Sequence, residues 1–406
     1  MDMAKPIIRF KGYQDDWEQR KLGELAEIVG GGTPSTSVDS YWDGDIDWYA
    51  PAEIGEQIYL KSSQRKITEE GLNKSSAKVL PVGTVLFTSR AGIGKTAILL
   101  KEGCTNQGFQ SIVPNKDKLD SYFIFTRSEE LKRYGEIVGA GSTFVEVSGK
   151  QMANMELMMP TTMDEQQKIG GYFSNLDHLI TLHQRKCDET KRLKKYMLQK
   201  MFPQNGEKVP EIRFSGFTDD WEQRKLSEIA LQTYGGGTPK TANEEFWKGN
   251  IPWIQSSDLI EERLFNVKPR KYISQEAISK SATKLVPQNS VAIVTRVGVG
   301  KLAFMPFSYA TSQDFLSLSE LKIEPEFAVY ALYKMMRLVS NEVQGTSIKG
   351  ITKDELLAKE ILIPDYEEQK KIGAYLHNLD HLITLHQREL ENLQNIKKFM
   401  LGKMFV

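Results

Sequence analysis

Two glycine turns that carry basic residues are the segments best suited to chemistry, namely the binding of an anion. SRAGIGK occupies residues 89–95 and TRVGVGK occupies residues 295–301. Glycine lets the backbone approach a ligand closely, and turn amides beside cationic side chains attract anions such as a DNA phosphate. A plain hairpin turn with solvated charges is the alternative. Because the pattern is duplicated, we give the two interpretations equal weight. The basic candidates are Arg90, Lys95, Arg296 and Lys301.

Other patterns associated with catalysis are incomplete or absent. GIGKT at residues 92–96 is not a phosphate-binding loop, because Ser89 stands where that motif requires glycine. Only His377 and His381 have the i, i+4 spacing of helical metal ligands, and no Glu-x-x-His motif accompanies them. His183 and His386 fall on apolar stripes and are expected to be hydrogen-bonded core residues. We therefore predict no catalytic residue, metal or cofactor in this chain.

The elements that position the turns occur twice. RFKGYQDDWEQRKLGELAEI from Arg9 aligns with RFSGFTDDWEQRKLSEIALQ from Arg213, a shift of 204 residues. GGGTP follows at residues 30–34 and 235–239, and every tryptophan has a counterpart in the other half. Residues 111–138 and 317–339 have little in common. The repeat predicts two domains with one scaffold and different faces.

Each repeat ends in a segment with helical periodicity. NLDHLITLHQR is identical at residues 175–185 and 378–388, and apolar residues recur at steps of three and four around it. We predict helices over residues 164–202 and 364–406, each roughly 55 Å long. Antiparallel pairing as a coiled coil would bury both stripes and place the two globular domains at opposite ends. The predicted helix-pair core comprises Ile169, Phe173, Leu176, Ile180, Ile372, Leu376, Leu379 and Ile383.

The remaining segments mix short β-rich runs with glycine turns and short helices, which indicates an α+β fold. We expect a first domain with an N-terminal segment over residues 1–163 and a second domain over residues 218–363. A linker rich in proline and glycine joins them at residues 203–217. Residues 1–13 match the end of that linker, so the chain resembles a two-fold arrangement cut at one point.

Bulk composition narrows the possible partners and location. The 53 lysines and arginines balance 53 aspartates and glutamates, so any basic surface must be local. Cys104 and Cys187 form no disulfide pattern, and no apolar run approaches the roughly 20 residues of a membrane span. The N-terminus lacks the features of a signal peptide. A cytoplasmic protein is expected.

The motifs and their order resemble the specificity subunits of type I restriction-modification systems. The resemblance is carried by DDWEQRKLGE, GGGTP, TSRAGIGK, GSTF at residues 141–144 and DEQQKIGGYFSNLDHLI at the helix start. It covers nearly the whole chain. The second half departs in places, since GSTF becomes GTSI and Ser89 becomes Thr295.

The resemblance implies a non-catalytic subunit whose two domains each read one half of an asymmetric, bipartite double-stranded DNA target. It also implies that the helices set the spacer and dock methyltransferase subunits, and that a translocating restriction subunit joins them. S-adenosylmethionine, ATP and Mg would then belong to the partner subunits. The candidate DNA-binding residues are Thr33, Ser89, Arg90, Lys95, Gln107, Ser142, Thr143, Thr238, Thr295, Arg296, Lys301, Gln313, Thr346 and Ser347.

A structural adaptor that organises partner proteins without reading DNA is the alternative, because paired helices alone would serve either role. An autonomous nuclease or ATPase would need acidic metal ligands or a complete phosphate loop, and neither is found in the sequence. The neutral net charge suggests that partners contribute part of the positive surface for DNA.

Overall fold

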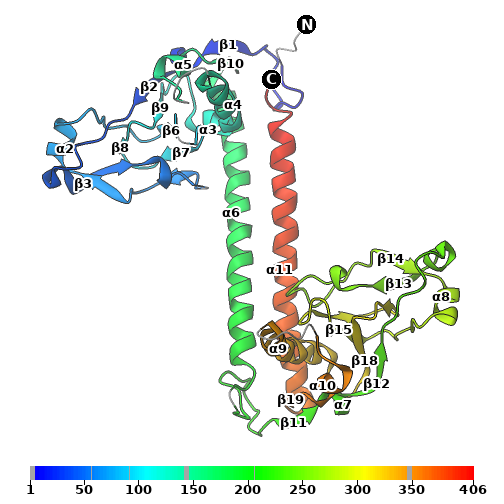
Figure 1. Ribbon diagram of the computed structural model, residues 1–406. Helices are drawn as coiled ribbons and strands as arrows, with labels where there is room; N and C mark the ends of the chain where they lie inside the picture. The colour runs from blue at the N-terminus through cyan, green and yellow to red at the C-terminus, as the bar shows by residue number, and fades with distance from the viewer. Residues whose placement is uncertain (1–4, 56, 91, 141–145, 205, 345–349) are drawn as a thin grey trace. The chain divides into compact units, whose positions relative to one another are not determined.

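The computed structural model describes residues 5–55, 57–90, 92–140, 146–204, 206–344 and 350–406 (Figure 1). The chain divides into two compact units, and each unit combines one globular domain with parts of both long helices. Residues 1–184 and 388–406 form the first unit, and residues 185–387 form the second. The boundary between the units thus crosses both long helices, and the five-segment division expected from the sequence stays a prediction.

The described strands of the first domain form three sheets. Their orders are β2-β9-β6-β7-β4, β5-β3-β8 and β1-β10. The strands are β1 (Glu18–Lys21), β2 (Ala26–Gly30), β3 (Trp42–Tyr49), β4 (Tyr59–Leu60), β5 (Arg65–Ile67), β6 (Val85–Phe87), β7 (Thr96–Leu99), β8 (Cys104–Thr105), β9 (Gln110–Pro114) and β10 (Glu156–Met159). The helices are α1 (Leu22–Leu25), α2 (Glu69–Asn73), α3 (Ser121–Thr126), α4 (Ser128–Gly139) and α5 (Gly149–Ala153), with 3-10 turns η1 (Asp39–Tyr41) and η2 (Pro51–Glu53).

The second domain repeats this plan. Its described strands are ordered β12-β18-β15-β16, β14-β13-β17 and β11-β19. The strands are β11 (Glu222–Lys225), β12 (Ala230–Gly235), β13 (Ile251–Ile254), β14 (Lys271–Ile273), β15 (Ser290–Val294), β16 (Leu302–Met305), β17 (Ala310–Thr311), β18 (Phe315–Leu321) and β19 (Glu360–Ile363). The helices are α7 (Leu226–Ile229), α8 (Gln275–Lys280), α9 (Pro325–Gln344) and α10 (Lys353–Ala358), with η3 (Glu244–Trp247) and η4 (Ser256–Asp258). The α+β fold and the duplication are confirmed.

The two domains differ most where the sequences diverge. In the first domain, α3 and α4 meet at Arg127, whose backbone leaves the helical conformation. Its guanidinium donates to Met158 O at 2.6 Å and to Glu130. In the second domain a single helix, α9, occupies the corresponding part of the chain. The same position in the scaffold therefore carries a broken helical layer in one half and a continuous one in the other.

The long helices are α6 (Met163–Lys200) and α11 (Tyr366–Leu401), close to the predicted spans (Figure 1). Neither they nor any other described helix has the length and apolar content needed to cross a membrane. Within the first unit, Phe173 of α6 packs near Phe405, and Asp177 binds Lys397 at 2.6 Å. Residue numbers rise along α6 as they fall along α11, so the pairing is antiparallel, as predicted.

The predicted helix stripe is largely buried, but it packs against the domains as well as against the other helix. Ile169, Phe173 and Leu176 share one apolar cluster with Trp17 and Phe123 of the first domain. Ile180 is only half-buried. In the second unit, Ile372, Leu376, Leu379 and Ile383 are buried, and the first three share a cluster with the second domain.

Each domain core is completed by the aromatic residue that follows a long helix. Phe405, which follows α11, lies 6.1 Å from Trp17 and 5.6 Å from Phe123 between ring centroids. Phe202, which follows α6, lies 5.8 Å from Trp221 and 5.6 Å from Phe327. The helix of one repeat therefore closes the core of the other repeat's domain.

Backbone pairing beside these residues supports the idea of a two-fold arrangement cut at one point. In the second unit, Ile212 N donates to Lys200 O at 2.9 Å, where the linker passes the end of α6. In the first unit, Ile8 N donates to Lys403 O, also at 2.9 Å. The N-terminal segment therefore contacts the C-terminal segment in the first unit in the same way as the linker contacts the end of α6 in the second unit.

A buried ion pair anchors the start of each long helix. Arg9 binds both carboxylate oxygens of Glu165 at 2.6 and 2.8 Å. Arg213 binds both oxygens of Glu368, each at 2.8 Å. Neither glutamate is exposed to solvent. Since a buried carboxylate is costly without a cation, each pair holds the segment before the domain against the helix that follows it.

Glu368→Gln should lower the free energy of unfolding by about 3 kcal/mol, because it leaves the half-buried Arg213 without its carboxylate. Urea denaturation followed by circular dichroism measures the change. The control is Glu367→Gln, which removes an exposed pair with Lys370 and should cost less than about 1 kcal/mol. Equal effects of the two substitutions would contradict the anchoring role.

Candidate nucleic-acid interface

Three loops of the first domain meet at the end of its main sheet. The Thr33 hydroxyl, from GGGTP, donates to the Gln107 side chain. The backbone N–H of Ser89, at the start of the glycine turn, donates to Gly108 O at 2.8 Å. Val147 N in turn donates to Ser89 O at 3.0 Å. The structure thus brings together segments that lie far apart in the sequence.

The second domain assembles the same loops. Gly237 N, from its GGGTP segment, donates to Thr311 O at 2.8 Å. Thr295 N donates to Asp314 O at 2.7 Å, and Ile351 N donates to Thr295 O at 2.8 Å. The glycine turn therefore lies between the same two neighbours as in the first domain, and the site is duplicated with its scaffold.

Glycine is required where the loops press together. A side chain at Gly31 would place Cβ 1.9 Å from Asn106 O, and one at Gly236 would place it 1.8 Å from Ser312 O. The turns themselves use positive φ at Gly92 (103°) and Gly298 (91°). Such angles strain residues that carry Cβ, which explains why both turns are built on glycine.

A perpendicular pair of tryptophans supports each GGGTP segment. Trp48 Nε1 donates to Gly32 O at 2.8 Å, and Trp253 Nε1 donates to Gly237 O at 3.0 Å. The second ring of each pair, Trp42 or Trp247, lies 5.1 or 5.0 Å away between centroids. The equal spacing of the tryptophans in both repeats was the signal for this role, which sequence analysis did not assign.

A cation lies over each tryptophan pair, contributed by the neighbouring strand. Arg65 of β5 pairs with Trp48 of β3 and places its guanidinium 3.7 Å from the Trp42 ring centroid. Lys271 of β14 pairs with Trp253 of β13, and its ammonium lies 5.5 Å from the Trp247 centroid. Cation–π attraction stabilises both arrangements.

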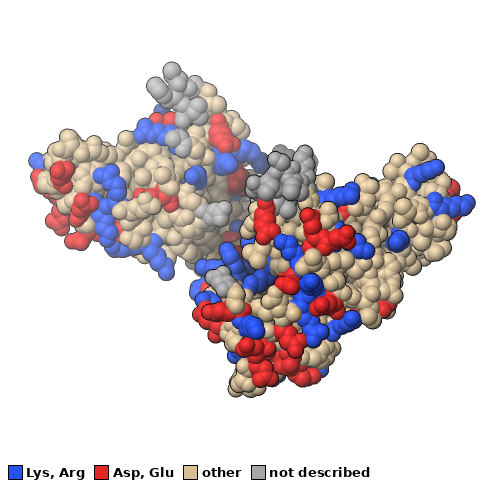
Figure 2. Space-filling model, turned by 60° about the horizontal axis from the view of Figure 1, so that its bottom comes forward, with Lys and Arg blue, Asp and Glu red and all other residues tan. Residues whose placement is uncertain are grey.

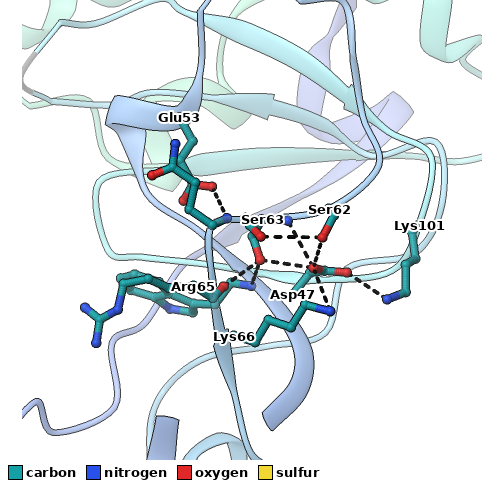
Figure 3. A network of polar contacts seen from close by, with 9 residues as sticks. Asp47, Glu53, Ser62, Ser63, Arg65, Lys66 and Lys101 are labelled. Carbon is teal, nitrogen blue, oxygen red and sulfur yellow. Dashed lines mark hydrogen bonds and ion pairs between the residues drawn. The ribbon is translucent and has the colours of Figure 1, made fainter. Parts of the chain in front are cut away.

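The first domain has a buried carboxylate beside this layer (Figure 3). Asp47 is fully buried and accepts hydrogen bonds from Lys101 Nζ at 2.8 Å, Ser63 N at 3.0 Å and Ser62 Oγ at 3.1 Å. Lys66 Nζ lies 3.8 Å away. Burial alone would raise the pKa of Asp47, but the hydrogen bonds from Lys101, Ser63 and Ser62 outweigh it and lower the pKa to about 2. The charge of these lysines is therefore balanced locally.

The second domain has no carboxylate at the position of Asp47, and a hollow lined in part by cations lies beside its tryptophan pair. Pro252 stands at the position of Asp47, facing Tyr272 where the first domain has Lys66. The hollow has a volume of about 740 Å³. Its lining includes Trp247, Lys248, Arg270 and Lys271. Lys248 pairs with Glu245 at 2.7 Å, and Arg270 lies 3.5 Å from the buried Asp258, so these two cations are partly balanced. On the face shown in Figure 2, lysine and arginine side chains form several separate groups with acidic groups between them. Basic surface is thus local, as the neutral composition requires.

The candidate residues differ in accessibility. Lys95, Gln107, Thr238, Arg296 and Gln313 are exposed. Thr33, Arg90 and Lys301 are half-buried. Arg90 also lies 3.9 Å from Glu146, so a ligand at this arginine would compete with that carboxylate. Ser142, Thr143, Thr346 and Ser347 lie outside the described residues.

Ser89 and Thr295 are the two buried members of the sequence-based list. Ser89 is fully buried, and Thr295 is 8% exposed and donates its hydroxyl to Asp314 O at 3.1 Å. Both residues are held on two sides by backbone hydrogen bonds to neighbouring loops, which turns their side chains inward. Both hydroxyls are buried in this structure, and the backbones of the two residues join the neighbouring loops.

The comparisons with known proteins cover both repeats. A family model described as "Type I restriction modification DNA specificity domain" matches residues 14–192 and again residues 218–395. The type I restriction enzyme MjaIX specificity subunit of Methanocaldococcus jannaschii is 27% identical, over 96% of this chain and 92% of the relative. The putative MjaX specificity subunit of the same organism is 23% identical, over 95% and 91%. These matches extend through both domains and both long helices.

A solved structure has the same fold. The S subunit of a type I restriction-modification system from M. genitalium superimposes with a TM-score of 0.66. The comparison covers 99% of both chains at 12% sequence identity. Similarity at this level of identity concerns the fold, which is thus preserved over almost the full length.

Asp47→Asn should destabilise the first domain by about 2 kcal/mol at pH 7, because the low pKa of Asp47 reflects stronger binding of its charged form in the folded state. Because the pKa of Asp47 is lower in the folded state than in the unfolded state, its charge stabilises the fold fully at pH values above the unfolded pKa near 4. This stabilisation is lost as the pH falls toward the folded pKa of about 2. The difference in stability between the two proteins should therefore shrink between pH 4 and pH 2. Thermal melts across this range measure it, and a difference independent of pH would contradict the assignment.

Proposed function

The chain belongs to the family of type I restriction-modification DNA specificity domains, and on this basis we propose that it is a non-catalytic specificity subunit that selects the DNA site of a larger complex. Each globular domain reads one half of an asymmetric, bipartite double-stranded target. The observation that carries the proposal is the duplicated loop cluster, which presents exposed polar and basic side chains on two copies of one scaffold.

Differences between the clusters support an asymmetric target. The loops that meet, their glycines and the tryptophan pairs are shared, whereas individual charged positions beside them differ. Asp43 and Gln64 of the first domain correspond to Lys248 and Arg270 of the second in the strand alignment around the tryptophans. Because base edges and phosphates are read by individual side chains, a changed surface on a conserved scaffold gives a different half-site.

The distribution of charge suggests how DNA is held. Arg90 and Lys95 in one domain, and Arg296 and Lys301 in the other, are placed to contact phosphates. Exposed amides of Gln107 and Gln313 are suited to base edges. With no net charge on the chain, much of the non-specific attraction to DNA falls to partner subunits.

Restriction and modification subunits are the partners that family membership indicates. In this proposal the paired helices set the spacer between half-sites and dock the methyltransferase subunits. S-adenosylmethionine, ATP and Mg act in the partners, where methylation, translocation and cleavage take place. Family membership favours this role over an adaptor that does not read DNA.

Gln107→Ala and Gln313→Ala should each weaken selection at one half-site only, by about 1–3 kcal/mol, because each exposed amide is proposed to read a base edge. The variants are assembled with their modification subunits and given DNA libraries in which one half-site is randomised while the other stays constant. Sequencing of the methylated products measures selection at each half.

The control for these variants is Arg185→Ala, which changes an exposed arginine on α6 and should leave both half-sites unchanged. Equal loss at both half-sites from either domain variant would contradict separate readers. Methylation without any sequence selection by the unaltered complex would overturn the proposed function itself.

A further inference from the structure

A buried carboxylate joins three elements of the first unit. Asp177 of α6 is 6% exposed. It accepts a hydrogen bond from the Tyr122 hydroxyl of α3 at 2.9 Å and from Lys397 Nζ of α11 at 2.6 Å. One aspartate therefore binds the domain's helical layer and the opposite long helix at the same time.

The second unit contains the same cluster. Asp380 of α11 accepts from the Tyr330 hydroxyl of α9 at 2.6 Å and from Lys194 Nζ of α6 at 2.6 Å. The Lys194 side chain is 9% exposed and the Asp380 side chain is 20% exposed, so this aspartate is less buried than Asp177. In both units the aspartate and the tyrosine come from one repeat and the lysine comes from the other. The two clusters are therefore reciprocal.

The contacts between each aspartate and its lysine form only when α6 and α11 are aligned in one register. Burial, reinforced by the neighbouring aspartate, raises the pKa of both tyrosines, which keeps their hydroxyls protonated as donors. A buried carboxylate that loses its cation pays a large desolvation cost, whereas apolar contacts along a helix stripe tolerate displacement better. Polar groups at such positions are well suited to select one helix register among several apolar alternatives.

A displacement of the helices by four residues leaves neither aspartate a substitute cation. Slippage by four residues in one direction would bring Leu401 opposite Asp177 and Leu198 opposite Asp380. Slippage in the other direction would bring Leu393 and Thr190 to these positions. Either displacement removes both cations together, so the two clusters select the same register.

We propose that Asp177 with Lys397, and Asp380 with Lys194, are positioning residues that hold the helix pair in one register and thereby restrict the spacer length accepted between the two half-sites. The proposal rests on the function proposed above. It assigns spacer selectivity to two reciprocal ion pairs, with Tyr122 and Tyr330 linking each pair to its domain.

The test measures methylation by the complex with modification subunits. The substrates share both half-sites and differ only in spacer length, from two base pairs shorter to two longer than the preferred spacer. Asp177→Asn combined with Asp380→Asn should raise methylation of the non-preferred spacers about tenfold relative to the preferred one, because the register loses its ionic selection. Half-site sequences should stay unchanged, which a merely structural loss of activity would not reproduce.

Two further variants give the comparison its controls. Arg185→Gln with Glu189→Gln removes an exposed pair on α6 and should leave spacer preference intact. Lys194→Arg with Lys397→Arg keeps the cations and should retain the preference. Circular dichroism and size-exclusion chromatography establish folding and assembly. If the double asparagine variant does not fold, Asp177→Asn alone is measured and should broaden the spacer range to a smaller extent.

Unchanged spacer preference in a folded asparagine variant would overturn the inference while leaving the proposed function standing. Absence of any bipartite motif for the unaltered complex would instead count against the proposed function. The two failures are therefore distinguishable in one set of reactions.

Discussion

The fold depends on one packing constraint, which is that neither globular domain closes its core with residues of its own repeat alone. Phe405 completes the core around Trp17, and Phe202 completes the core around Trp221. Each of these residues follows the long helix of the other repeat, so each core includes a residue from both repeats. The stability of each domain therefore depends on the pairing of the helices. The backbone hydrogen bonds of Ile8 to Lys403 and of Ile212 to Lys200 show the same arrangement in both units.

Polar interactions fix the positions of the segments that the aromatic residues bring together. The ion pairs of Glu165 and Glu368 hold each domain's first segment against the start of a helix. Asp177 and Asp380 then tie the helices to one another and to the domains. Apolar burial supplies most of the driving force for folding, while these carboxylates, which are buried or half-buried, disfavour alternative alignments of the helices. Within each unit, these contacts hold the domain that carries the exposed loops against the long helices.

Sequence analysis predicted the large features because they leave long, repeated signals. The shift of the repeat, the span of both helices and the α+β class could all be predicted from periodicity and self-comparison. The burial of individual side chains, and the contacts they make, could not be predicted in the same way. Ser89 and Thr295 lie beside Arg90 and Arg296 in sequence, yet both are buried between neighbouring loops. Asp47 and the tryptophan pairs were also missed as a supporting layer, because their role depends on strand pairing between segments far apart in sequence.

The central claim is that this chain chooses the DNA sequence on which its partners act. Modified-base sequencing tests it most directly, in cells that carry the gene with its cognate methyltransferase and in cells from which this gene alone is removed. The account predicts a bipartite methylated motif that disappears with the gene. An unchanged methylome, produced by a methyltransferase shown to be active, would contradict the account.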